Sequence, residues 1–183
     1  MKFSKTDFGY DLPSELIAKY PSQQRTESKT LILDNKFTIQ FFKDTLNHFA
    51  EYDLVVLNET KVRPARILLQ KDSGGYVEIL ILQKTTKYRA VCLAKGLNRK
   101  KTNQTLYAPN FPVKIKIISN VSKDIEIEFD QDIDQLCTQI GQMPIPPYLG
   151  REVEKIDTER YQTVFANDER LGSAAAPTAS LHM

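Results

Sequence analysis

The sequence predicts an α+β protein in which a strand-rich middle interrupts a region of mixed helices and strands. Residues 31–57 show the order strand, helix, strand, which is typical of a βαβ unit with a buried parallel sheet. Residues 65–129 contain several short strand-like runs with no helix between them, and helical patterning returns after residue 132. With 183 residues, 41% of them hydrophobic, the chain is long enough for one ordinary domain or two small ones.

The first predicted element is a short helix at residues 11–20. Pro13 suits a first helical turn, and Pro21 cannot continue the helix. Leu16 and Ile17 supply its apolar face.

The βαβ unit is expected next along the chain. Residues 31–34 (LILD) and 53–57 (DLVVL) are apolar runs of the kind found in buried strands. Between them, residues 41–50 carry apolar side chains at helical spacing, namely Phe42, Leu46 and Phe49. We therefore expect two parallel strands joined by this helix.

The predicted secondary structure changes to strands alone after Pro64. Strand-like runs follow one another at residues 65–71, 76–83, 88–95, 113–119 and 125–129. The last two alternate apolar and polar residues most clearly. Strands at this spacing predict a small antiparallel barrel or sandwich.

The end of the chain is predicted to be helical again. Residues 133–140 have helical patterning, and the proline-rich residues 143–149 (MPIPPYL) favour a rigid connector back to the first region. A further helix is expected at residues 157–166, with Asp157 or Thr158 as its cap.

Composition narrows the class of protein. The formal net charge is +2, so charge alone does not indicate a nucleic-acid binder. No apolar run is long enough to span a bilayer and no signal peptide is recognisable, so we expect a soluble cytoplasmic protein.

Cys92 and Cys137 have no metal-ligand spacing and are expected to be buried free thiols. Dinucleotide, phosphate-loop and zinc-protease motifs are absent from the sequence.

Residues 58–66 (NETKVRPAR) are a candidate binding stretch because they follow a predicted buried strand. Ligands in open α/β sheets bind at the carboxyl ends of strands, which favours ligand-facing side chains at Asn58, Thr60, Arg63 and Arg66. A charged turn with Arg66 in a surface ion pair is an equally good interpretation.

Residues 160–163 (RYQT) bring a cation, a phenol, an amide and a hydroxyl together, enough to bind a ribose, a phosphate or a base edge. A core tyrosine beside a solvated arginine is the commoner arrangement. Neither His48 nor His182 stands out as a general base. The basic residues 97–101 (LNRKK) are more typical of a solvated loop than of a phosphate-binding site.

Six stretches of the chain resemble one enzyme family. They are DFGYDLPSELIAKYP from Asp7 with the later Arg25 and Ser28, DLVVLNETKVRPAR, GGYVEILIL, GQMPIPPYLGR, DTERYQTVFA and AAPTASLH. In this order they are similar to the motifs of the S-adenosylmethionine:tRNA ribosyltransferase-isomerases, and the resemblance runs almost from end to end.

The resemblance implies an α/β barrel-like domain, incomplete here, interrupted by an inserted antiparallel β-barrel. The expected domains are 1–64 and 150–183 for the α/β part and 65–149 for the barrel. It also implies transfer and isomerisation of the ribosyl group of S-adenosylmethionine onto 7-aminomethyl-7-deazaguanine at the wobble position of a tRNA. The product is epoxyqueuosine, and adenine and methionine are released.

The same resemblance implies the partners and the site residues. The partners are the tRNA anticodon stem-loop and S-adenosylmethionine as ribosyl donor, with no metal; a monomer is expected for the complete enzyme, and the oligomeric state of this chain is left open. By the resemblance, the catalytic residues are Arg66, Arg160 and Tyr161, and the substrate-binding residues are Asn58, Thr60, Gln162, Thr163, Pro177, Thr178 and His182.

The sequence also departs from the family pattern. Lys29 and Lys61 replace arginines, and Ser180 replaces a glycine, which would strain the backbone if a positive φ were needed there. Family chains continue well past the last motif, so we expect an uncovered sheet edge. A non-catalytic tRNA-binding fragment is the alternative function, and a remnant of a decayed gene is a third interpretation.

Overall fold

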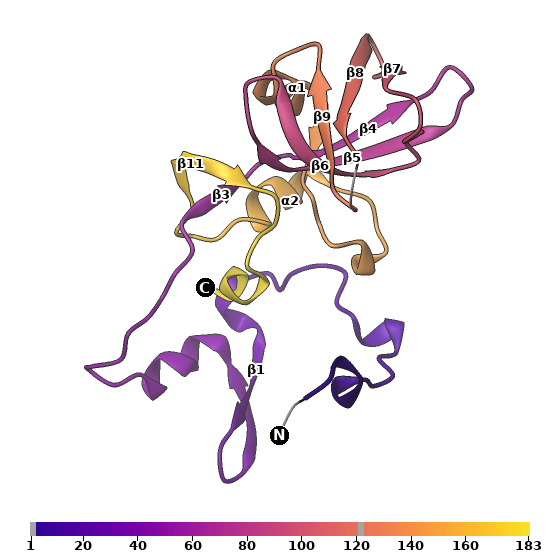
Figure 1. Ribbon diagram of the computed structural model, residues 1–183. Coiled ribbons are helices and arrows are strands. Elements are labelled where there is room, and N and C mark those ends of the chain that lie inside the picture. The colour runs from indigo at the N-terminus through magenta and orange to yellow at the C-terminus, as the bar shows by residue number, and fades with distance from the viewer. Residues whose placement is uncertain (1–2, 121–122) are drawn as a thin grey trace.

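The computed structural model describes residues 3–120 and 123–183. Figure 1 shows a β-barrel at one end of the molecule and the N-terminal segment, residues 3–57, at the other. A small sheet of β3 and β11, together with α2, lies between them.

Six strands of the described residues form a closed antiparallel barrel, as the sequence predicts. In their order around the barrel they are β4 (Arg66–Gln70), β5 (Tyr76–Lys84), β6 (Arg89–Lys95), β9 (Ile125–Phe129), β8 (Pro112–Ser119) and β7 (Asn103–Tyr107). Pairing of Gln70 with Tyr107 joins the first strand to the last and closes the ring. The strand β7 is an addition to the sequence prediction.

Alternation of side chains explains why these segments form a barrel. In β8, Val113 and Ile115 are buried in the interior while Lys114 and Lys116 are exposed. The same period of two in β9 fills the interior with Ile125, Ile127 and Phe129. Apolar burial on one face of each strand therefore drives closure of the sheet.

The helix α1 (Ile133–Ile140) joins the barrel core and has the predicted bounds. Ile133 and Leu136 are fully buried among the barrel side chains. The Asp132 carboxylate accepts a hydrogen bond from the backbone N–H of Asp134 at 2.8 Å, which caps the helix N-terminus. Cys92 and Cys137 are buried free thiols in this core, as expected.

The chain enters and leaves the barrel at one point, where only glycine fits. A Cβ at Gly141 would lie 2.0 Å from the Pro64 carbonyl oxygen and 2.3 Å from that of Cys137. Here β10 (Gly141–Gln142) pairs antiparallel with the start of β4. The two ends of the barrel segment are therefore held together by backbone contact.

A second core lies beside this junction. It contains Val62, Met143, Ile145, Tyr161 and Ala176.

Two strands and a short helix frame this second core. The strand β3 (Thr60–Val62) pairs in parallel with β11 (Asn167–Ser173), with irregular register. The helix α2 (Lys155–Arg160) is shorter than the predicted helix at 157–166, because the backbone leaves the helical conformation at Tyr161. The rigid connector continues into a 3-10 turn, η5 (Pro147–Leu149).

The predicted βαβ unit is wrong. The strand β1 (Lys29–Leu33) pairs antiparallel with β2 (Phe37–Phe41), which makes a hairpin. The expected helix is the 3-10 helix η4 (Phe42–His48). Residues 53–57 form no strand, and Leu54 and Val56 are 89% and 84% exposed. A strand needs a neighbour for its backbone groups, and none of the described residues offers one there.

The predicted helix at 11–20 is also wrong. This stretch forms a single 3-10 turn, η2 (Ser14–Leu16), with Pro13 outside it in an extended conformation. Two similar turns flank it, η1 (Lys5–Phe8) and η3 (Arg25–Glu27).

The last element is η6 (Thr178–His182). Among the described residues, no helix combines the length and apolar character needed to cross a bilayer.

Candidate functional site

A cavity of about 330 Å³ lies where the N-terminal segment meets the end of the chain. Its walls come from residues 18–28, from the proline-rich connector, from α2 and from η6. Four predicted site residues line it, namely Arg160, Tyr161, Thr178 and His182. The structure thus brings together parts of four stretches that the sequence analysis singled out.

The cavity lining combines apolar and aromatic side chains with polar ones. The apolar and aromatic residues include Tyr20, Pro21, Ile145, Pro146, Tyr148 and Leu149. Besides the predicted residues, the polar ones include Ser22, Ser28, Arg151 and Asp157. Such a lining suits a ligand with a flat face and several hydrogen-bonding groups.

Two arginines tie the walls of this cavity together. Arg160 donates hydrogen bonds to the carbonyl oxygens of Ser22 at 2.8 Å and Gln23 at 3.1 Å. Arg25 donates hydrogen bonds to three backbone carbonyls on the other wall. They belong to Glu159 in α2 (3.0 Å), Gln162 just after α2 (2.8 Å) and Leu181 in η6 (3.3 Å). Burial, and then the positive charge of Arg160, lower the pKa of Arg25 from its ordinary value.

Tyr161 combines both roles that the sequence left open. Its side chain belongs to the second core and is 7% exposed, yet it also lines the cavity. Burial raises the pKa of its hydroxyl, which interacts with the backbone of Ala176. Tyr161 is therefore a neutral hydrogen-bonding group at the cavity wall.

A buried ion pair in the cavity wall supports α2, and sequence reasoning missed it. Arg151 donates two hydrogen bonds of 2.7 Å to the Asp157 carboxylate. Its guanidinium lies over the Tyr20 ring, 4.6 Å from the centroid, and the Tyr20 hydroxyl donates to Glu154 at 2.6 Å. Tyr20, Arg151 and Asp157 stand in the quoted family stretches, and the only role expected for Asp157 was that of a helix cap.

The remaining site predictions fall outside this cavity. Gln162 uses both ends of its amide on Val62, accepting from the N–H at 2.9 Å and donating to the carbonyl at 2.7 Å. The Thr163 hydroxyl donates to the Asn58 carbonyl at 3.1 Å. The Asn58 side chain accepts from the hydroxyl and N–H of Thr60. The structure therefore uses these polar groups to join β3 to the segment after α2.

Arg66 and Pro177 also lie away from the cavity lining. Arg66 begins β4 in the barrel and donates to Glu78 on β5 at 3.0 Å. Pro177 is the residue before η6. Ser180 lies within η6, and no described residue other than glycine has a positive φ, so the condition for strain at Ser180 is not met.

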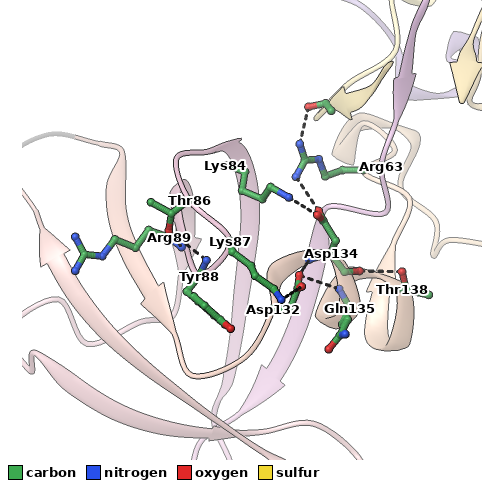
Figure 2. Close-up of polar contacts among 11 residues, drawn as sticks. Arg63, Lys84, Thr86, Lys87, Tyr88, Arg89, Asp132, Asp134, Gln135 and Thr138 are labelled. Carbon is green, nitrogen blue, oxygen red and sulfur yellow. Dashed lines mark hydrogen bonds and ion pairs between the residues drawn. The ribbon is translucent and has the colours of Figure 1, made fainter. Parts of the chain in front are cut away.

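Arg63 is a junction residue rather than a cavity residue. Its side chain is buried, and it donates to the Gly172 carbonyl of β11 at 3.3 Å. On its other side it lies 3.9 Å from Asp134 of α1, which also pairs with Lys84 of β5 (Figure 2). The neighbouring Asp132 pairs with Lys87 at 3.3 Å. This network connects the barrel to the small sheet.

Comparison with known proteins gives consistent similarities. The model of the family described as queuosine biosynthesis protein matches residues 5–183. A protein of Acinetobacter baumannii (strain SDF), named S-adenosylmethionine:tRNA ribosyltransferase-isomerase, is 45% identical over 181 residues, covering 97% of this chain and 51% of that protein. A protein of the same name from Syntrophomonas wolfei is 39% identical over 180 residues, covering 94% of this chain and 51% of its own.

Among solved structures, an S-adenosylmethionine tRNA ribosyltransferase from Thermotoga maritima is similar over 73% of this chain and 48% of that chain. The sequence identity is 24% and the TM-score is 0.36. The chain spans about half the length of the curated relatives it matches.

Proposed function

Because the chain belongs to the family of queuosine biosynthesis proteins, we propose that it is the N-terminal part of an S-adenosylmethionine:tRNA ribosyltransferase-isomerase. The proposed reaction moves the ribosyl group of S-adenosylmethionine onto 7-aminomethyl-7-deazaguanine at the tRNA wobble position, with isomerisation to epoxyqueuosine. Adenine and methionine leave. The α/β barrel-like domain and the cytoplasmic location expected from the sequence belong to the same proposal.

The observation that carries this proposal is the cavity between the N-terminal segment and η6. A nucleoside has a flat base, which packs against apolar and aromatic side chains, and a ribose, which needs hydrogen-bonding partners. The cavity lining offers Tyr148 and Pro146 for the base, and Thr178 and His182 for the ribose. S-adenosylmethionine would supply there a ribosyl carbon activated by the adjacent sulfonium.

The chain's own residues would bind and orient this donor. Thr178 offers a hydroxyl to the ribose, and Tyr161 offers a neutral phenol. Arg160 is held in place by the carbonyls of Ser22 and Gln23, so it presents a fixed positive edge to the cavity. Reactants held in fixed orientation and shielded from water gain much of their rate from that arrangement.

A tRNA-binding fragment without catalysis is the second candidate function. It is favoured by the position of Arg66, which lies on the barrel while the other predicted catalytic residues, Arg160 and Tyr161, lie at the cavity. In that case the barrel would hold tRNA and the cavity would take no part in a reaction.

Two measurements on the 183-residue chain separate these functions. Calorimetry should detect S-adenosylmethionine binding, weakened about tenfold by Thr178→Val, because one hydroxyl contact is worth about 1.4 kcal/mol. The matched control Thr138→Val changes a hydroxyl on α1 that bonds to the Asp134 carbonyl, and it should leave binding unchanged.

Adenine release is then measured with an anticodon stem-loop carrying the aminomethyl-deazaguanine. Release above the protein-free rate supports the enzyme. Binding of the stem-loop with no adenine release supports the tRNA-binding fragment, and absence of S-adenosylmethionine binding contradicts the proposed donor site.

A further inference from the structure

A chain of hydrogen bonds runs along the cavity wall from one serine to the imidazole of His182. The Ser22 hydroxyl donates to the Gln24 carbonyl at 2.6 Å. Ser22 Oγ lies 3.2 Å from Ser28 Oγ, and Ser28 Oγ lies 2.8 Å from His182 Nδ1. Three of these residues, Ser22, Ser28 and His182, line the cavity.

The first of these hydrogen bonds sets the direction of the others. A serine hydroxyl has one proton, and Ser22 spends it on the Gln24 carbonyl. In the contact between the two serines, Ser28 must therefore donate and Ser22 accept. The alternative acceptor for the Ser28 proton, the Arg25 carbonyl at 3.4 Å, leads to the same result.

The arrangement that keeps all three hydrogen bonds has Ser28 donating to Ser22 and accepting from His182, so that Nδ1 carries a proton. The opposite arrangement, with Ser28 donating to Nδ1, leaves the two serine oxygens 3.2 Å apart with no proton between them. In a neutral imidazole one nitrogen is a donor and the other an acceptor, so the Nδ1–H form leaves a lone pair on Nε2.

We propose that Ser22 and Ser28 are positioning residues that hold His182 in its Nδ1–H form, and that Nε2 is the proton-accepting atom of the cavity. The assignment rests on the proposed function and names its base. The C–H bond of the ribosyl CH₂ beside the sulfonium breaks, its electron pair stays on that carbon, and an N–H bond forms at Nε2. His182 becomes the doubly protonated imidazolium until the proton passes to the leaving adenine.

The other ionisable groups around the cavity are less suited to this role. The Arg151 guanidinium holds the pKa of Asp157 below its usual range, so that carboxylate is a weak base. Burial raises the pKa of Tyr161 and keeps its phenol protonated. The Phe42 ring packs beside the imidazole, with 6.1 Å between the ring centroids, and helps to fix its plane.

The tautomer is tested without any reaction. Long-range ¹H–¹⁵N spectra of the ¹⁵N-labelled chain at about pH 8, where an ordinary imidazole is neutral, distinguish Nδ1–H from Nε2–H. His182 should show the Nδ1–H form. Ser28→Ala should change it to a mixture, and Ser28→Thr, which keeps the hydroxyl, should restore it. His48, which lies on η4 away from the cavity lining, serves as the internal reference.

Base function is tested by hydrogen exchange into the donor. S-adenosylmethionine is incubated with the chain in D₂O, and deuterium at the ribosyl CH₂ is measured by mass spectrometry. At saturating donor, His182→Gln should reduce exchange by about 100-fold or more, the usual contribution of a general base. Ser28→Ala should reduce exchange by about tenfold, and the control His48→Gln should not change it.

The outcomes separate the proposal from the function on which it rests. Failure to bind the donor contradicts the proposed function, while the tautomer experiment still judges the hydrogen-bond chain. Binding without protein-dependent exchange, or exchange that survives His182→Gln, overturns the role of His182 as base. An Nε2–H form in the unsubstituted chain overturns the positioning role of the serines.

Discussion

Several predicted ligand contacts are used to hold the fold together. Gln162, expected to bind substrate, bonds through both its amide oxygen and its amide nitrogen to the backbone of Val62. The sequence predicts that residues 160–163 (RYQT) lie near the site, but it does not predict which of their side chains face the cavity. Because α2 ends at Arg160, Gln162 is no longer part of the helix, and it does not line the cavity that Arg160 and Tyr161 line.

The structural role of Gln162 predicts a measurable loss of stability. Gln162→Ala leaves the N–H and carbonyl of Val62 without these partners, which should lower the free energy of unfolding by about 1–3 kcal/mol. Urea unfolding followed by circular dichroism measures this. Gln139→Ala, at an exposed position on α1, should change stability by less than about 0.5 kcal/mol. Equal effects of the two substitutions would contradict the account.

The two thiols make a second prediction for individual residues. Burial raises the pKa of Cys92 to about 12 and that of Cys137 to about 11. Because the thiolate is the reactive form, the folded chain should react with a disulfide reagent at about pH 8 only through unfolding. In urea both thiols should react at once. Rapid labelling of the folded chain would show that the barrel interior is accessible.

Elements with a clear local cause were predicted well. The helix α1 has a capping aspartate and an apolar face, and β8 and β9 have strict alternation. Asp34, Asn35 and Lys36 form a turn signal that explains the hairpin of β1 and β2, whereas the βαβ prediction pairs the first strand with the apolar run at residues 53–57. Parallel pairing of β3 with β11 joins segments about a hundred residues apart, which local patterns do not encode.

The ion pair between Arg151 and Asp157 predicts how α2 responds to mutation. Asp157→Asn leaves Arg151 as a buried charge without its partner and weakens the turn that begins α2. Loss of one partner of a buried pair should cost about 3–5 kcal/mol in unfolding free energy. Urea unfolding at neutral pH provides the measurement. Glu152→Gln, an exposed neighbour, is the matched control and should be close to neutral.

The same pair predicts a dependence on pH. Arg151 lowers the pKa of Asp157 below its ordinary value of 3.8. A carboxyl group whose pKa is lower in the folded state stabilises the fold above its unfolded-state pKa, and this contribution is lost as pH falls through the folded-state value. Asp157→Asn should therefore flatten the decline in stability below about pH 4. An unchanged acid limb would contradict the assignment.

At the scale of the whole molecule, the barrel is well packed and the N-terminal segment is not. Leu33, Phe37, Ile39, Leu54 and Val56 are each at least 70% exposed. Apolar surface of this extent favours association in water.

Self-association through residues 53–57 is a testable consequence. Replacing Leu54 and Val56 together by lysine should reduce concentration-dependent association in sedimentation velocity. Both side chains are exposed, so stability should change by no more than about 0.5 kcal/mol per site. Lysine substitution at Tyr76, which is 77% exposed on the barrel strand β5, should leave association as it was. A similar decrease for both variants would place the association elsewhere.

The central claim is that the cavity between the N-terminal segment and η6 receives the nucleoside part of S-adenosylmethionine. Titration of the isotope-labelled chain with S-adenosylmethionine, followed by NMR shifts of every assigned residue, tests it most directly. The account predicts the largest shifts at Tyr148, Tyr161, Thr178 and His182, with the barrel signals unmoved. Shifts centred on Arg66 and the barrel, or none at saturating ligand, would contradict it.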